Sequence, residues 1–273
     1  MPIPQIPHHG AYTQVMSTPG DGIAVTYVGH ATALLELAGL RILTDPLLRT
    51  RLGPIRRVVP SPHPAMLDRL DAVLISHLHH DHLDLASLRT LPGEIRLIAP
   101  PGAGSLLRKA GHREVLELPR NRSVCLGAVA VRAVEAVHSG LRVPFGPRGE
   151  AVGYVLTSPG RALYFAGDTD LFPGMASLHP HVDVALVPIW GWGPHLRGGH
   201  MGPARAAKAV QLIRPRYAIP IHWGTYWPFA LGHYRKSRLT APPAEFRNFV
   251  EELAPATSTI VLSPGDRWEM HEP

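Results

Sequence analysis

The segment Ser76-His77-Leu78-His79-His80-Asp81-His82 carries the strongest structural signal in this chain. It places four histidines within six residues, directly after the apolar run 71–75, which is typical of a buried β-strand. If the two-residue period of the strand continues, His77 and His79 point the same way, and a turn brings Asp81 and His82 back toward them. Imidazole and carboxylate groups gathered in this way are typical metal ligands, so the segment predicts two half-sites for metal ions.

A plainer interpretation treats the same segment as a helix start. Asp81 would cap the helix, Asp84 would reinforce its first turn, and the histidines would be loop residues without a role. Capping leaves the alternation of imidazoles and carboxylate directly after a strand unexplained. The metal-binding interpretation is therefore favoured.

Further ligands are expected where later strands end. His138 ends the run 129–137, Asp168 follows 162–167, and His222 follows 217–221. Each of these alone is typical of a surface or turn residue. Together they complete a dinuclear site, in which His77, His79 and His138 hold one metal ion, Asp81, His82 and His222 hold the other, and Asp168 bridges them.

The composition predicts a globular protein in a reducing compartment. The chain has 273 residues, of which 45% are hydrophobic and 18% charged, which excludes a disordered chain. The single cysteine, Cys125, cannot form an internal disulfide and is expected to be structural, so we expect a cytoplasmic protein. Residues 1–20 contain four prolines and no periodicity, which predicts an irregular tail before a single domain over 21–273. The sequence contains no apolar run of the roughly 18 residues that a membrane span needs, and no export signal is expected.

The positive charge consists almost entirely of arginine. All but three of the 27 basic residues are arginines, and the net charge is +6. Arginine favours oxyanions, but the sequence contains no run of five basic residues, so no nucleic-acid partner is expected. The segment 48–58 carries Arg49, Arg51, Arg56 and Arg57, which could bring a guanidinium to a phosphate or could form a solvated basic loop.

Periodicity predicts one α/β domain made of two sheets with helices outside. Eleven strands are expected at 23–28, 33–37, 41–44, 72–76, 96–99, 129–137, 152–157, 162–166, 182–188, 217–220 and 259–262. Five helices are expected at 83–91, 102–110, 172–179, 203–213 and 242–253.

The metal motif, with Gly167-Asp168-Thr169 and Ile221-His222-Trp223-Gly224-Thr225, resembles the metallo-β-lactamase superfamily of metal-dependent hydrolases. Two further motifs, 27–32 (YVGHAT) and 43–46 (LTDP), are similar to the branch with N-acyl phosphatidylethanolamine-hydrolysing phospholipase D and the ascorbate-6-phosphate lactonase-like proteins. The resemblance spans about 23–262. It implies an αββα sandwich of two mixed sheets, with metals at one edge and the seven ligands named above.

The resemblance also draws attention to four residues around the ligands. Asp45 is expected to accept the second ring N–H of a ligand such as His79, or else to be a turn residue before proline. His30 is expected to line the floor of the site or to fix the loop after the first strand. His200 matches the place where the phospholipase branch carries a histidine beside its pocket, with a solvent-facing role as the alternative. His233 is a candidate to bind an oxyanion or to protonate a leaving group.

Aromatic residues follow two of the strands that end at the site. Trp190 and Trp192 alternate with glycines, and Tyr226 and Trp227 follow His222 closely. Aromatic residues on loops often line pockets, so these four are expected around the substrate, with ordinary core packing as the alternative.

The expected function is that of a dinuclear metal-dependent hydrolase. A hydroxide held between two metal ions would be the nucleophile, with Asp81 and Asp168 orienting it. Ligands without thiolates favour two zinc ions, with manganese or iron as alternatives. The expected substrate is a small molecule of the phosphodiester class. The alternatives are a lactonase or other carboxylic ester or amide hydrolase, and, more remotely, a non-catalytic metal-binding protein, which would be expected to lack some of the seven ligands.

Overall fold

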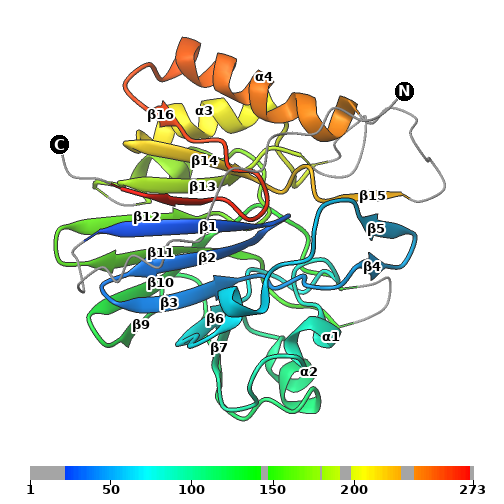
Figure 1. Cartoon of the computed structure of the whole chain (residues 1–273). Coiled ribbons are helices and arrows are strands. Elements are labelled where there is room, and N and C mark those ends of the chain that lie inside the picture. Colours follow the sequence, from blue (N-terminus) through cyan, green and yellow to red (C-terminus); the bar gives the residue numbers. More distant parts are fainter. Residues whose placement is uncertain (1–21, 143–146, 179, 191–197, 229–236, 271–273) are drawn as a thin grey trace.

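Two seven-stranded mixed sheets form the centre of the protein in the computed structural model, which describes residues 22–142, 147–178, 180–190, 198–228 and 237–270 (Figure 1). The first sheet has the order β17 (Arg267–Glu269), β1 (Ile23–Gly29), β2 (Thr32–Leu37), β3 (Leu40–Thr44), β6 (Ala72–Leu74), β7 (Arg96–Ala99) and β8 (Val115–Glu117). The second has the order β16 (Ser258–Thr259), β14 (Tyr217–Ile221), β13 (Val184–Pro188), β12 (Arg161–Phe165), β11 (Val152–Ser158), β10 (Val129–Glu135) and β9 (Ser123–Leu126).

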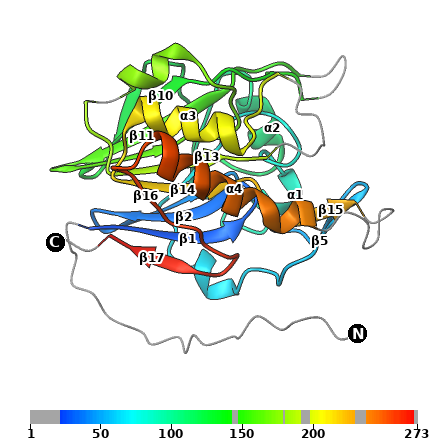
Figure 2. The same cartoon turned by 90° about the horizontal axis from the view of Figure 1, so that it is seen from above.

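Helices cover the outer faces, which confirms the predicted αββα sandwich. Figures 1 and 2 show α3 (Pro203–Ile213) and α4 (Ser237–Leu253) together outside β13 and β14. The short helices α1 (Leu85–Leu88) and α2 (Gly104–Lys109) follow β6 and β7 on the other side of the molecule. No helix among the described residues is long and apolar enough to cross a membrane.

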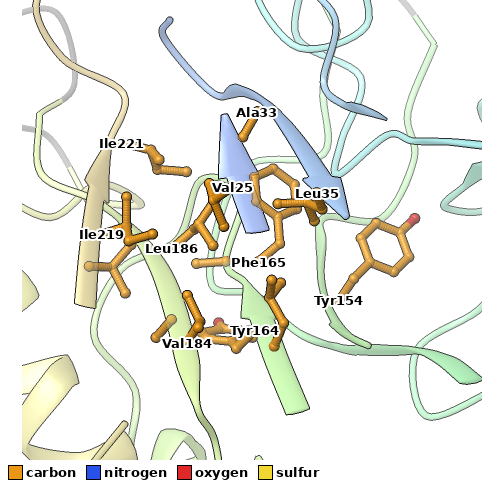
Figure 3. Packing of buried hydrophobic residues seen from close by; sticks show 14 of the residues in the cluster. Val25, Ala33, Leu35, Tyr154, Tyr164, Phe165, Val184, Leu186, Ile219 and Ile221 are labelled. Atoms are coloured by element: carbon orange, nitrogen blue, oxygen red, sulfur yellow. The ribbon is translucent and has the colours of Figure 1, made fainter. Parts of the chain in front are cut away.

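Successive side chains of the first sheet point to opposite faces, and both faces are buried. Val25 and Leu35 pair in register and point into the core between the sheets, where they meet the second sheet at Phe165 and Leu186 (Figure 3). Their neighbours point the other way. Leu34, Leu43 and Val73 pack with Leu88 of α1 and Leu107 of α2 in a second cluster. Because both faces are covered, these strands read as nearly continuous apolar runs.

The predicted helices differ from the structure mainly in length. Only α3 has the predicted bounds. The helix predicted at 83–91 is reduced to the four residues of α1, and its cap is Asp84, whose side chain accepts the Ser87 N–H, so Asp81 does not cap it. The segment predicted as a helix at 172–179 is the 3₁₀ turn η2 (Pro173–Ser177), since five residues starting with Pro-Gly cannot sustain an α-helix. α4 starts earlier than predicted, so Pro242 and Pro243 lie inside it.

Several short strands of the structure were not predicted from the sequence. A small third sheet consists of β15 (Tyr226–Pro228), β5 (Ile55–Arg57) and β4 (Arg51–Leu52), and part of the segment expected as a basic loop is therefore a hairpin. β8, β9 and β17 were also not predicted, because a strand of three or four residues is too short to show a periodic pattern of apolar residues. Cys125 lies exposed on β9. The expected tail at 1–20 lies outside the described residues.

The strand directions bring the predicted ligands to one edge of the sandwich. β3 and β6 are parallel, as are β12, β13 and β14, and β10 runs in the direction of β12 because two antiparallel pairings separate them. The carboxyl ends of β3, β6, β10, β12 and β14 therefore meet the ligand-bearing loops at a common edge.

Candidate metal centre

Three histidines from two loops form the first group of the site. His77 Nε2 and His138 Nε2 each lie 3.0 Å from His79 Nδ1, and the three rings pack edge to face. His77 and His79 come from the loop after β6, whereas His138 follows β10 in the other sheet. The structure thus brings together the three residues predicted for one metal.

A second group lies next to the first. His82 Nε2, His222 Nε2 and Asp168 Oδ2 are each 3.3 Å from the other two. Asp81 Oδ2 completes the group at 3.7 Å from His82 Nε2 and 3.8 Å from His222 Nε2. Asp168 also belongs to a set with His138 and His200 whose potential ligand atoms all lie within 4.8 Å of one another. This carboxylate therefore lies between the two groups.

Hydrogen bonds behind the rings determine which nitrogens face inward. Nδ1–H of His77 donates to Ser76 Oγ at 3.0 Å, Nδ1–H of His82 donates to Asp45 Oδ2 at 2.7 Å, and Nδ1–H of His138 donates to the Gly199 carbonyl at 2.6 Å. In a neutral ring, each such bond leaves Nε2 without a proton and directed at the other ligands. Such outer hydrogen bonds orient metal-binding imidazoles and raise their basicity.

Asp45 supports two ligands, and its histidine differs from the one expected. The sequence suggested His79 as its partner, whereas the structure places the carboxylate on His82. Its oxygens also accept the Ser76 N–H at 2.7 Å and the Ser76 hydroxyl at 2.5 Å, and Ser76 Oγ in turn meets His77. Ser76 was not singled out in the sequence, because a serine before the motif carries no distinctive pattern.

Three observations indicate that these residues can bind metal ions. Zinc bonds to nitrogen and oxygen of about 2.0–2.1 Å give a tetrahedron with edges of about 3.3 Å, and the atoms of His82, His222 and Asp168 in the second group have the same spacing. When His77 and His138 are neutral, both of their Nε2 atoms face His79 Nδ1 at 3.0 Å, and the one proton that this atom can carry does not satisfy both, which favours a cation among them. Finally, Asp168 Oδ1 is buried without a hydrogen-bond partner among the described residues, which is costly for a carboxylate oxygen.

The electrostatics point the same way, because three carboxylates surround one buried imidazole. Burial opposes a charge on His82, but Asp168, Asp81 and Asp45 outweigh it and hold the His82 pKa well above its usual value. Burial likewise opposes the charge on Asp168, but His222 and His82 hold its pKa well below the ordinary range. The carboxylates therefore stabilise positive charge at His82, within the second group.

His30 and His200 both border the site. Nε2–H of His30 donates to Asp81 Oδ2 at 3.0 Å, and the His30 ring lies 3.8 Å from the His222 ring, centroid to centroid. Burial, reinforced by His222, lowers the His30 pKa to about 3, so the ring is neutral and serves as a donor. His200 is partly exposed, and its Nδ1 lies 3.4 Å from Asp168 Oδ2.

The structure places three of the expected pocket aromatics inside the protein. Tyr226 is buried, and its hydroxyl donates to the carbonyls of Leu47 and Arg49. Trp190 and Trp227 are buried and stack with centroids 6.4 Å apart. Packing thus accounts for these three side chains. Trp192 and His233 lie outside the described residues.

Two of the four arginines in the segment 48–58 bind the protein itself. The buried guanidinium of Arg57 donates to the carbonyls of Val28 at 2.5 Å, Pro60 at 2.9 Å and Leu47 at 3.4 Å. Arg49 Nε lies 3.0 Å from Asp84 Oδ2. Arg51 and Arg56, which face each other across β4 and β5, are exposed.

An αββα sandwich with histidines and aspartates gathered at one sheet edge defines the metallo-β-lactamase class of folds. The chain belongs to the beta-lactamase superfamily, since residues 40–223 match the Beta-lactamase superfamily domain. A UPF0173 metal-dependent hydrolase from Aeropyrum pernix is 34% identical over 262 residues, which cover 90% of this chain and 96% of the relative. An uncharacterised protein from Mycobacterium tuberculosis is 34% identical over 220 residues, which cover 75% of this chain but only 59% of that longer relative.

A solved structure supports the fold independently. Igni18, described as a novel metallo hydrolase from the hyperthermophilic archaeon Ignicoccus hospitalis, superposes with a TM-score of 0.71. The match covers 92% of this chain and 100% of that chain at 24% sequence identity, so it shows a shared fold.

Proposed function

We propose that the protein is a hydrolase with a dinuclear metal centre, held by the seven residues predicted from the sequence. The observation that carries the proposal is the triangle of His82 Nε2, His222 Nε2 and Asp168 Oδ2, whose 3.3 Å edges match a metal's ligand spacing. His77, His79 and His138 would hold one ion. Asp81, His82 and His222 would hold the other, and Asp168 would bridge them. The printed name of the Aeropyrum pernix relative, a metal-dependent hydrolase, supports the same activity.

Bound zinc, or manganese or iron in its place, would lower the pKa of a bound water to about 7 and polarise a substrate oxygen. The protein's own groups would supply the remaining functions. Asp81, held by His30, and Asp168 would orient the attacking water. His200 is partly exposed beside Asp168 and, in its protonated imidazolium form, would give a proton to the leaving group. His233 remains a second candidate for that proton.

A phosphodiester is the substrate class that we propose first. Arg51 and Arg56 are exposed and pair in register on the hairpin, and guanidinium groups suit an oxyanion. The resemblance to the phospholipase D side of the branch supports the same class, whereas the lactonase-like side supports the second candidate. The second candidate is a lactone or other carboxylic ester. It is favoured by the engagement of Arg49 and Arg57 within the protein, which leaves fewer guanidinium groups for a phosphate.

Hydrolysis assays with zinc- and manganese-loaded protein test the proposal. A chromogenic phosphodiester and a generic lactone are offered in parallel to the wild type and to Asp81→Ala and Asp168→Ala. Metal-dependent turnover of the phosphodiester, lost in both variants, is the expected result. Turnover of the lactone alone would establish the second candidate. Two bound ions without turnover of either substrate would contradict both and favour a non-catalytic metal-binding protein.

A further inference from the structure

A short segment after His138, made up of the described residues 140–142 and 147–149, lies against the ligand loop 77–82. Leu141 pairs with Arg148 in an isolated antiparallel bridge, and the Gly149 N–H donates to the Gly140 carbonyl at 2.8 Å. The backbone of Leu141 hydrogen-bonds the His79 ring. Gly149 packs so closely on the loop that a β-carbon there would lie 2.5 Å from Leu78 Cδ1. The segment therefore packs closely against the loop that carries His79.

Arg142 extends from this segment and binds the loop on both sides of its ligands. Its Nη1 donates to the Leu78 carbonyl at 2.7 Å and to the Leu83 carbonyl at 3.0 Å. These two carbonyls immediately precede and follow residues 79–82. One half-buried guanidinium thus connects the two ends of the ligand loop.

The same guanidinium also binds His80, the one histidine of the segment 76–82 that belongs to neither ligand group. Nη2 of Arg142 donates to His80 Nδ1 at 3.1 Å, and the His80 side chain is exposed. His80 lies in the turn after His79 and belongs to none of the ligand sets formed by the described residues. His80 therefore acts as an acceptor for Arg142.

The ligand loop 77–82 has few backbone hydrogen bonds of its own among those of the described residues. Within it, the backbone amides of His82 and Leu83 both donate to the His79 carbonyl, at 3.1 and 2.8 Å. The following helix α1 has only four residues. A loop with so few internal bonds needs outside contacts to hold three ligands in a fixed geometry.

We propose that Arg142, together with its acceptor His80, is a positioning residue that holds the ligand loop in its metal-binding conformation. The inference rests on the proposed metal centre. The planar guanidinium supplies several donors in a fixed fork and reaches three acceptors at once, which a lysine ammonium on a flexible stem cannot reproduce. The fork orders the loop before metal binding, so that less conformational entropy is lost when an ion binds.

The test compares zinc affinities of the full-length wild type, Arg142→Ala, Arg142→Lys and Arg148→Ala, by competition with a chromophoric chelator. Arg148 is the matched control, because it is an exposed arginine of the same segment. We expect both Arg142 variants to bind zinc about 10–100-fold more weakly than the wild type, as for other supports of metal ligands. Arg148→Ala should stay within about twofold of the wild type.

A second readout separates loop positioning from general stability. In metal-free protein, hydrogen exchange at the His82 and Leu83 amides should become faster in the Arg142 variants, with the sheets unchanged. If Arg142→Ala fails to fold, the milder Arg142→Lys variant supplies both readouts. Arg142→Lys with wild-type affinity and wild-type exchange would overturn the inference while leaving the metal centre intact. A wild type that binds no zinc would instead overturn the proposed function on which the inference rests.

Discussion

Asp45 shows how one buried carboxylate can organise a whole site. It has a φ of 34°, in the left-handed region that side chains rarely adopt, and His30 and His222 share this conformation with φ of 59° and 63°. Three strained residues at one site indicate that their side-chain positions matter more than local backbone energy. Asp45 reaches His82 directly and His77 through Ser76, and therefore supports a ligand in each group.

Asp45→Asn is predicted to weaken metal binding by about 10–100-fold, because an amide replaces the carboxylate that accepts from His82 and Ser76. Isothermal titration of metal-free protein with zinc measures the effect. Asp183→Asn is the matched control, since Asp183 is equally buried but accepts from Ala162 N–H at 2.9 Å, away from the ligands. Equal zinc affinities in the two variants would show that Asp45 serves stability alone.

The buried neutral histidines predict how the metal-free protein responds to acid. Burial, followed by His222, lowers the His30 pKa to about 3, and burial, followed by His82, places the His77 pKa well below 6.5. In the unfolded chain these rings take up protons near pH 6.5, so the unfolded state binds more protons and stability falls as the pH drops from 6.5 toward 4. The raised pKa of His82 adds no slope in this window, because its contribution is already complete below the unfolded value.

Urea denaturation of chelator-treated protein should therefore give a free energy of unfolding that falls by about 1.4 kcal/mol per pH unit for each such histidine. His30→Asn should show a shallower decline than the wild type. His63→Asn, which removes an exposed histidine, is the control. A wild-type free energy that is flat between pH 6.5 and 4 would contradict this prediction.

Among the structural elements, the turn at Gly198 and Gly199 before α3 holds the ring of His138 in position. Gly199 has a φ of 100°, and its carbonyl accepts the Nδ1–H of His138. A β-carbon at Gly199 would lie 2.9 Å from that same nitrogen. The turn thus requires glycine both for its backbone conformation and for the close approach of the ring.

Gly199→Ala is expected to lower zinc affinity at the His77, His79 and His138 group, because the added methyl group pushes the His138 ring off its position. Gly160→Ala is the matched control. Gly160 also has a positive φ, of 74°, but a β-carbon there meets nothing within 4 Å, so that variant carries the backbone strain alone. Chelator competition on both variants isolates the steric effect. Similar affinities in the two variants would refute it.

Long periodic segments were predictable, and short or long-range features were not. The run 203–213 repeats apolar residues at helical spacing and became α3 with the same bounds. The central strands were predicted to within a few residues for the same reason. β15 exists because it pairs with β5, some 170 positions earlier in the chain, and no local pattern encodes that partner. The tryptophans at 190 and 227 were expected around a pocket, but both are buried, and Trp190 stacks on Trp227 of β15.

Considered as a whole, the molecule collects its ligands from four separate loops at one edge of the sandwich. Their residue types and strand-end positions were predictable, because a metal needs imidazole and carboxylate groups and parallel strands end at a common edge. Their supports were harder to predict. Asp45 pairs with a different histidine from the one suggested, and Ser76, Gly199 and Arg142 act through hydrogen bonds that depend on the folded chain.

Metal content is the decisive property of this site. Purified protein reconstituted with zinc, freed of excess ion and analysed by inductively coupled plasma mass spectrometry should contain two zinc ions per chain. His79→Ala and His82→Ala should each retain one, because each variant breaks only one of the two groups. A wild type with no bound zinc, or with a single ion that both variants lose, would contradict a dinuclear centre bridged by Asp168.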